Sequence, residues 1–298
     1  ASVARGGTSD EVLRVLDGLA RRYGLVGASV PEAGQSLRVF ERALVHDLAD
    51  TVNATSVAWN LQALQSCAQA LRERLSSEHW KLIQEVGDHF KQHLQAVLAQ
   101  SAVAPLSDVM GVLARADTHL AAITGAQTDR MTRDDGWRLL SVGRQIERLD
   151  FLSTVLAEGF EQGLQLRDDG FALLLGLFDS TITYRAQFQG RREVPPLLHL
   201  LVLDTDNPRS LGWVARTLRE RFVKLSRHQA DWAGEAVIPL PRPEDWPLDR
   251  ISAADDAGRH ALLIGLLQDC SEQAQALSTQ IGRRLFSHVG TPDRMVWQ

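Results

Sequence analysis

The positions of the ten prolines constrain the fold of this 298-residue chain more than any other feature of its sequence. No proline lies between Pro31 and Pro105, and none lies between Pro105 and Pro195. Because proline interrupts helices, these two intervals leave room for long unbroken helices. The chain has only 2 tyrosines and is rich in Leu and Ala, which argues against a β-rich fold. We therefore predict an all-α protein, a single bundle of long helices with one irregular Pro-rich crossing.

Capping residues and apolar periodicity locate the predicted helices. The run Thr8-Ser-Asp-Glu11 reads as a capping box at the start of the first helix. Pro208 is predicted at the first position of a later helix, with Asp206 or Asn207 as its N-cap. We expect irregular structure over residues 189–209. Predicted helices cover residues 8–23, 35–48, 51–75, 77–100, a stretch after Pro105, 133–160, 168–188, a stretch from Pro208, and 252–288.

We expect one domain over residues 1–298, with four parts. They are an N-terminal helix and linker (1–34), a bundle core (35–230), a Pro- and Trp-rich non-helical crossing (231–250), and a C-terminal helix and tail (251–298).

Composition excludes several classes of protein. The formal net charge of −5 and the absence of a dense Lys/Arg tract argue against a nucleic-acid partner. No apolar run approaches the roughly 20 residues that a membrane span requires. Cys67 and Cys270 lack metal-ligand spacing, so we expect two reduced, buried thiols in a cytoplasmic protein. The chain begins with Ala1 rather than Met, which leaves open whether it is a fragment of a longer protein.

A charged triplet, Arg144, Glu147 and Arg148, lies in a helix with apolar side chains on two sides. Spacings of three and four residues allow both arginines to reach Glu147. Two readings stay open. The triplet is an internal ion-pair network, or it lines a polar pocket in which Glu147 is an acid, base or amine ligand and the arginines hold a carboxylate or phosphate. The two apolar stripes are Leu139, Val142, Ile146, Leu149, Leu156 and Phe160 on one side, and Trp137, Leu140, Phe151 and Val155 on the other.

Arg185 extends a similar apolar stripe in the next predicted helix, after Phe171, Leu174, Phe178 and Ile182. A buried guanidinium needs an anionic partner, which again points to an internal ion pair or a binding pocket.

The segment Asp204-Thr-Asp-Asn-Pro-Arg-Ser210 opens a predicted helix. Its backbone amides, together with Arg209 and Ser210, offer an anion site, although an ordinary N-cap explains the same pattern. The preceding Gln-Gly-Arg-Arg192 run, which contains Arg191, adds positive charge nearby in sequence.

Glu85, His89 and His93 lie four residues apart on one predicted helix, which is a possible metal-binding spacing. Glu85 and His89 point away from the apolar stripe of that helix, so a solvated face is the favoured reading and we expect no metal. The chain also lacks a Gly-rich phosphate loop and a Gly-x-Ser-x-Gly motif. Any ATP chemistry is therefore expected on another domain.

Several motifs together resemble one protein family, the alpha-E domain, an all-helical bacterial domain named for a Glu-Arg motif. The run Ser141-Val-Gly-Arg-Gln-Ile-Glu-Arg-Leu-Asp150 is similar to its Gly-Arg-x-x-Glu-Arg-x-(Asp/Glu) signature. Nothing before Ser36 resembles the family's first Glu-Arg motif, so the chain looks like an alpha-E domain without its first helix. The other matching segments are 56–61 with 71–76, Tyr184 to Arg191, Leu203 to Ser210, and Leu285 to His288.

The resemblance implies a role in ATP-dependent amide-bond formation between a carboxylate and an amine. Alpha-E domains accompany circularly permuted ATP-grasp ligases and often transglutaminase-like peptidases. ATP and Mg²⁺ are then expected on the partner ATP-grasp domain, with no cofactor on this chain. The substrate would be a small amine or a peptide. The alternative is a non-catalytic helical scaffold that docks such a ligase or peptidase.

The ligase reading makes a geometric prediction. The charged triplet, assigned a catalytic role, should converge on one cavity with the predicted substrate-binding residues. These are Tyr184, Arg185, Arg191, Asn207, Arg209 and Ser210.

Overall fold

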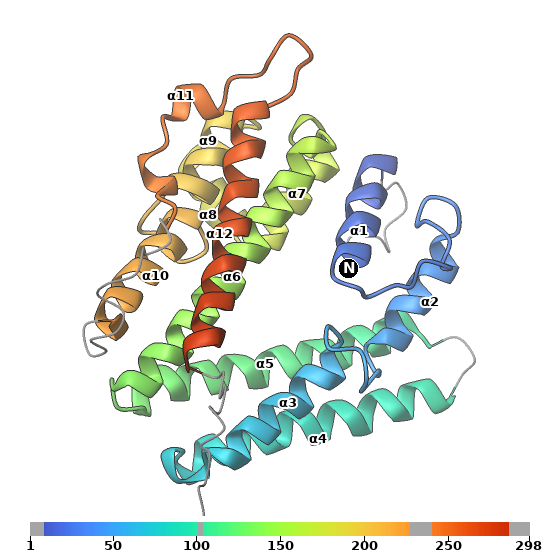
Figure 1. The fold of residues 1–298 in the computed structure, drawn as a ribbon. Helices are drawn as coiled ribbons and strands as arrows, with labels where there is room; N and C mark the ends of the chain where they lie inside the picture. The colour runs from blue at the N-terminus through green and yellow to red at the C-terminus, as the bar shows by residue number, and fades with distance from the viewer. Residues whose placement is uncertain (1–8, 101–103, 227–239, 286–298) are drawn as a thin grey trace, which may run out of the picture. The chain divides into compact units, whose positions relative to one another are not determined.

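The computed structural model describes residues 9–100, 104–226 and 240–285. Within these ranges helices are the only regular secondary structure, so the predicted all-α class is confirmed (Figure 1). None of these helices is both long enough and apolar enough to cross a membrane. The chain divides into two compact units, a division that we did not predict. Unit 1 contains the residues up to Trp137 and Gln162–Leu173, and unit 2 contains Arg138–Glu161 and the residues from Leu174 onward.

Unit 1 is built around two long antiparallel helices, α4 and α5, that lie side by side, with α3 packed on α4 (Figure 1). The start of α4 is set locally, because the Ser76 hydroxyl accepts a hydrogen bond from the His79 amide at 3.2 Å. The helices of this unit are α1 (Asp10–Arg22), α2 (Leu37–Asp47), α3 (Val57–Ala70), η1 (Arg72–Arg74), α4 (Ser77–Gln100) and α5 (Leu106–Arg130), and the unit also contains η2 (Leu164–Leu166).

Two apolar clusters stabilise unit 1. The larger one joins α3, α4 and α5, and the smaller one joins α1, α2 and the loop between them. Removing these side chains from water supplies most of the driving force for packing the helices. The larger cluster contains Leu61, Ala68, Ile83, Val86, Phe90, Leu94, Val112, Ala116 and Ile123, and the smaller one contains Ala20, Val26, Ala33 and Phe40.

Unit 2 contains most of α6 and the helices that follow α7. Leucines on α9, η3, α10 and α12 are fully buried, including Leu197, Leu200, Leu218 and Leu267. Burial on all sides explains why the segment before α10 is an apolar run without periodicity. Helix α7 (Asp168–Leu177) is divided between the units, since its residues up to Leu173 belong to unit 1. The other helices are α6 (Asp135–Glu161), α8 (Thr181–Phe188), α9 (Val194–Leu198), the π-helix η3 (His199–Leu203), α10 (Leu211–Ser226), η5 (Pro243–Asp245), α11 (Leu248–Ile251) and α12 (Ala261–Leu285).

The single helix predicted over residues 168–188 is wrong, because the chain breaks it into α7 and α8. Asp179 adopts a left-handed backbone conformation with a φ of 45°. The amide of Ser180 then bonds to the Leu175 carbonyl at 2.8 Å instead of continuing the helical ladder. Such a residue ends a helix in the same way that glycine often does, and α8 starts in a new direction.

The segment 189–209, predicted to be irregular, contains α9 and the π-helix η3. The predicted start of the next helix at Pro208 is also wrong, because α10 begins at Leu211. Its cap is Ser210, whose hydroxyl accepts the Trp213 amide at 3.0 Å. Pro208 lies in the turn before this cap.

Other helix boundaries differ from the predictions by several residues. The third helix begins at Val57 rather than at residue 51, and the last begins at Ala261 rather than at residue 252. In both places Ser or Asp side chains favour turns ahead of the helix. The cap of the first helix is Ser9, while Thr8 lies outside the described residues. Residues 231–239 of the predicted crossing and residues 286–288 of the predicted last helix also lie outside them.

The two cysteines differ in environment. Cys67 is exposed, contrary to the prediction of two buried thiols, whereas Cys270 is buried on α12. Burial raises the pKa of the Cys270 thiol to about 12. Cys270 is therefore a neutral side chain of the core at physiological pH.

We predict that Gly212→Ala destabilises the protein, because a Cβ atom there would lie 2.8 Å from the Leu203 carbonyl oxygen. The Val202 carbonyl oxygen would lie 3.0 Å away, and neither backbone atom can move without shifting η3. We expect a loss of roughly 1–3 kcal/mol in unfolding free energy, measured by urea denaturation followed by circular dichroism.

Gly176→Ala is the matched control, because a Cβ atom at this position in α7 would have nothing within 4 Å. That variant should be unchanged or up to about 1 kcal/mol more stable. Equal stability of the two variants would contradict close packing between α10 and η3.

Candidate functional site

Helix α6 carries the charged triplet, and its two apolar stripes differ in burial. Val142, Ile146 and Leu149 of the first stripe are at most 5% exposed. In the second stripe the middle is open, since Leu140 is 39% and Phe151 is 40% exposed. Glu147 lies in this open stretch and is exposed. The prediction that the whole triplet faces inward is therefore wrong for Glu147.

Arg148 is half-buried and joins α6 to the start of α10. Its guanidinium donates a hydrogen bond of 2.7 Å to the Pro208 carbonyl oxygen. The same group lies over the ring of Trp213, 5.8 Å from the ring centre, within cation–π range. No ion pair between Arg148 and Glu147 occurs in the part of the chain that the structure describes. The internal clamp that we considered for these two residues does not form.

Positive charge gathers around Arg148. Burial lowers the pKa of its guanidinium, and the charges of Arg144 and Arg209 lower this pKa further. Burial also lowers the pKa of Arg144. All three causes disfavour the charged form, yet an arginine side chain keeps its proton at neutral pH. An anion placed between these guanidinium groups would remove the electrostatic penalty.

One carboxylate lies at the edge of this cluster. The Arg209 guanidinium forms an ion pair of 2.6 Å with Asp179, the residue that separates α7 from α8. The Asp179 side chain is 81% exposed and that of Arg209 is 47% exposed. An exposed pair of this kind contributes at most about 1 kcal/mol, so a bound anion can compete with Asp179 for Arg209.

The segment 204–210 is a closed cap rather than a row of free amides. The Asp204 carboxylate accepts the amides of Asp206, at 2.8 Å, and Asn207, at 3.2 Å. The Asn207 side chain accepts the Arg209 amide at 3.1 Å and donates to the Leu200 carbonyl at 3.0 Å. These amides are therefore occupied, which agrees with the ordinary N-cap alternative and not with an anion site made of free amides.

Ser210 completes the cap. Its hydroxyl donates to the Asp204 carbonyl oxygen and accepts the Trp213 amide. Asn207 and Ser210 are both buried, so the contacts of these two predicted site residues are with the backbone around them. Asn207 and Ser210 therefore contribute to the arginine cluster by fixing the positions of Pro208 and Arg209.

Tyr184 is buried and has a local partner. Its hydroxyl donates to the Arg191 carbonyl oxygen at 2.5 Å, and its ring packs on Phe188. Burial raises the pKa of the Tyr184 phenol. The side chain of Arg191 is exposed. This hydrogen bond closes the turn after α8.

Arg185 does not continue a buried stripe, because the helix is broken at Asp179 before α8 begins. Both Arg185 and the neighbouring Ile182, which is 85% exposed, face outward. Arg144 and Arg209 lie close enough to Arg148 for their charges to lower the pKa of its guanidinium. That Arg185 shares a cavity with these arginines stays a prediction.

Three contributing residues were missed in the sequence analysis. Trp213 supplies the ring beneath Arg148, and Asp179 supplies the competing carboxylate. Asp150, at the end of the α6 signature, accepts hydrogen bonds from Ser271 at 2.5 Å and Gln275 at 3.0 Å on α12. The Asp-Ser pair at 179–180, which resembles an N-cap, was the one available signal of the helix break.

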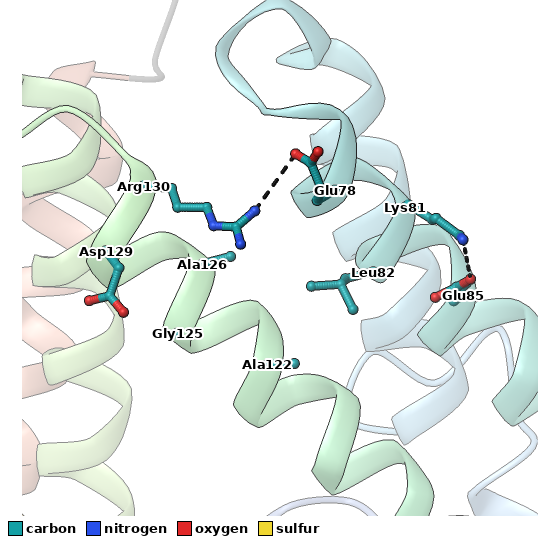
Figure 2. A pocket seen from close by; sticks show the side chains of 9 residues that line it. All are labelled: Glu78, Lys81, Leu82, Glu85, Ala122, Gly125, Ala126, Asp129 and Arg130. Carbon is teal, nitrogen blue, oxygen red and sulfur yellow. Dashed lines mark ion pairs between the residues drawn. The ribbon is translucent and has the colours of Figure 1, made fainter.

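Unit 1 contains a separate pocket of about 450 Å³ between α4 and α5 (Figure 2). Its cations are paired, Arg130 with Glu78 at 3.7 Å and Lys81 with Glu85 at 3.6 Å. Asp129 adds a further carboxylate to the lining. None of the predicted catalytic or substrate-binding residues lines this pocket.

The fold and the site define this chain as a helical domain in which the Glu-Arg motif of α6 contributes to an arginine cluster. Comparisons with known proteins identify the family. The model of the Alpha-E family, described as a predicted alpha-helical domain with a conserved ER motif, matches residues 6–286. The chain belongs to this family. The match includes the segment before Ser36, in which we found no counterpart of the first Glu-Arg motif.

Curated relatives are similar over part of their length. Uncharacterized protein Rv2567 of Mycobacterium tuberculosis (strain ATCC 25618 / H37Rv) is 27% identical over 222 residues, which cover 66% of this chain and 23% of that protein. Uncharacterized protein Mb2597 of Mycobacterium bovis (strain ATCC BAA-935 / AF2122/97) matches with the same identity and coverage. The chain thus spans less than a quarter of the length of these relatives. No solved structure matches it.

We predict that Asp150→Ala lowers the stability of the protein and that Glu147→Gln does not. Removing Asp150 takes away the acceptor of one hydrogen bond from Ser271 and one from Gln275 and should cost roughly 1–3 kcal/mol of unfolding free energy. Glu147 is exposed, so Glu147→Gln should leave the melting temperature unchanged. Thermal unfolding followed by circular dichroism measures both effects. A large destabilisation by Glu147→Gln would indicate that Glu147 belongs to an internal ion-pair network after all.

Proposed function

We propose that this chain is the Alpha-E module of an ATP-dependent ligase system that joins a carboxylate to an amine. In this proposal Arg144, Arg148 and Arg209 bind the anionic group of the substrate. The observation that carries it is the environment of Arg148, a half-buried guanidinium whose neighbours are a carbonyl oxygen, an indole ring and two further arginines.

A bound anion would stabilise such an arrangement. Holding like charges together away from bulk water opposes folding, whereas a carboxylate or phosphate between them forms charge-assisted hydrogen bonds. Guanidinium groups suit this task because their planar donors match the two oxygens of an oxyanion. Carboxylates and acyl phosphates are the groups that an amide ligase handles, which fits the charge of this cluster.

Nucleotide chemistry is assigned in this proposal to a partner ATP-grasp domain, which would bind ATP and Mg²⁺. The matched region makes up 23% of the relatives, so proteins of that kind have room for further domains beside an Alpha-E module. The helical module would present the substrate, a small amine or a peptide, to that partner. A transglutaminase-like peptidase is a second proposed partner.

Glu147 is the proposed acid, base or amine ligand. It precedes Arg148 in α6, and its exposed carboxylate is accessible to a substrate held by the arginines. A carboxylate beside an anion site would attract the amine of a substrate that carries both charges.

Anion binding is tested directly by isothermal titration calorimetry of the full chain with inorganic phosphate and with acetate. Arg148→Met should weaken binding at least tenfold, since a charge-assisted hydrogen bond is worth about 1.5–3 kcal/mol. Asp179→Asn should tighten binding roughly two- to fivefold by releasing Arg209 from its carboxylate. The stronger of the two probes indicates whether the site prefers a phosphate or a carboxylate.

Arg250→Met on α11 is the control, because Arg250 is an exposed arginine of the same unit outside the cluster. Its affinity for both probes should match that of the unmodified chain. Equal affinities for Arg148→Met and Arg250→Met would remove the arginine cluster from the proposal.

The ligase role is tested by mixing the chain with its partner ATP-grasp ligase and measuring amide formation together with ADP release. We predict that Glu147→Gln stays folded and lowers this activity by about 10²-fold or more, the usual contribution of an acid–base group. The scaffold alternative predicts the opposite, namely wild-type activity for both Glu147→Gln and Arg148→Met. That result would leave docking as the function of the module.

A further inference from the structure

Three histidines lie together on the surface of unit 1, and none of them belongs to the arginine cluster described above. His89 and His93 are four residues apart on α4, and His119 lies on α5. The ring centre of His89 is 6.0 Å from that of His93 and 5.6 Å from that of His119. The sequence analysis considered His89 and His93 but not His119, which the pairing of α4 with α5 brings beside them.

Two of these rings are held in one tautomer by backbone carbonyl groups. The Nδ1 atom of His93 lies 2.7 Å from the His89 carbonyl oxygen, and that of His119 lies 2.8 Å from the Arg115 carbonyl oxygen. A carbonyl oxygen only accepts hydrogen bonds, so each Nδ1 carries the hydrogen. In the neutral ring the lone pair is then on Nε2. Metal-binding histidines take this tautomer when a second group accepts a hydrogen bond from Nδ1.

We propose that His89, His93 and His119 form a binding site for a divalent transition-metal ion, of which Zn²⁺ is the best match. Imidazole nitrogens suit Zn²⁺, Ni²⁺ and Co²⁺ better than they suit Mg²⁺ or Ca²⁺. Two imidazoles that share one ion at nitrogen–metal distances of about 2.0 Å have ring centres roughly 5–6 Å apart. The distances from the His89 ring to the His93 ring and to the His119 ring, 6.0 Å and 5.6 Å, agree with this range.

The site forms on binding. The rings now meet edge to face, at 84° and 77°. As the side chains of the described residues are placed, no group of three or more His, Cys, Asp or Glu residues could hold a metal ion, so the proposed site requires the rings to rotate. His89 is exposed and the other two are half-buried, so small rotations of their side chains are possible. Water supplies the remaining coordination position, as in open zinc sites.

The surroundings both favour and limit binding. The rings border a small cavity of about 10 Å³, on an apolar floor formed by Val86, Phe90, Val112 and Ala116. Arg115 borders the same cavity, and its positive charge lowers affinity for a cation. Because Arg115 is exposed, its long side chain can turn toward solvent when the ion binds.

A bound ion would tie α4 to α5 and stabilise unit 1, since any ligand that binds only the folded state raises the melting temperature. The test is calorimetric titration of the full chain, without a histidine tag, with Zn²⁺ and Ni²⁺. Visible absorption on adding Co²⁺ then reports nitrogen coordination directly.

We expect binding that each of His89→Gln, His93→Gln and His119→Gln weakens at least tenfold, and a Zn²⁺-dependent rise in melting temperature that the triple variant lacks. His46→Gln on α2, an exposed histidine of the same unit, is the control and should bind as the unmodified chain does. Circular dichroism of each variant confirms folding. Absence of binding up to about 1 mM Zn²⁺, or binding that survives in the triple variant, would overturn the proposal.

Discussion

The hydrogen bond from Arg148 to the Pro208 carbonyl oxygen is the contact on which the arrangement of the arginine cluster depends. The cap before α10 satisfies its amides internally, through Asp204, Asn207 and Ser210. The Pro208 carbonyl is directed to α6 and fixes the guanidinium of Arg148 above the α10 ring of Trp213. The guanidinium of Arg148 is thereby held half-buried. In that position the charges around it strongly affect which ligand it can bind.

The sequence predicted features that depend on local interactions better than features that depend on packing. The α4 boundaries followed from the Ser76 cap and an uninterrupted helical pattern. The break at Asp179 was missed because the apolar spacing continues through it, and a single φ angle decides whether the helix does. The exposure of Glu147 was missed because helical periodicity shows which residues share a face of the helix but not which face another element covers.

The α6 signature combines two tasks that sequence comparison alone does not separate. Asp150 binds side chains of α12, and Arg148 binds the cap of α10, so both hold the unit together. Glu147 directly precedes Arg148 in sequence and has an exposed side chain with no comparable structural contact in the described residues. A residue of a family motif that is not needed for packing is the one whose presence calls for a chemical explanation.

Backbone carbonyl groups prepare both proposed sites in the same physical way. The Pro208 carbonyl orients Arg148, and the carbonyls of His89 and Arg115 orient His93 and His119. In each histidine the bond to Nδ1 leaves Nε2 as the lone-pair nitrogen, so a cation is the complementary ligand. A guanidinium has five N–H donors, and one hydrogen bond to a carbonyl oxygen leaves most of them available to an oxyanion. The same backbone contact therefore prepares opposite charges, because the side chain that it orients determines whether donors or a lone pair remain.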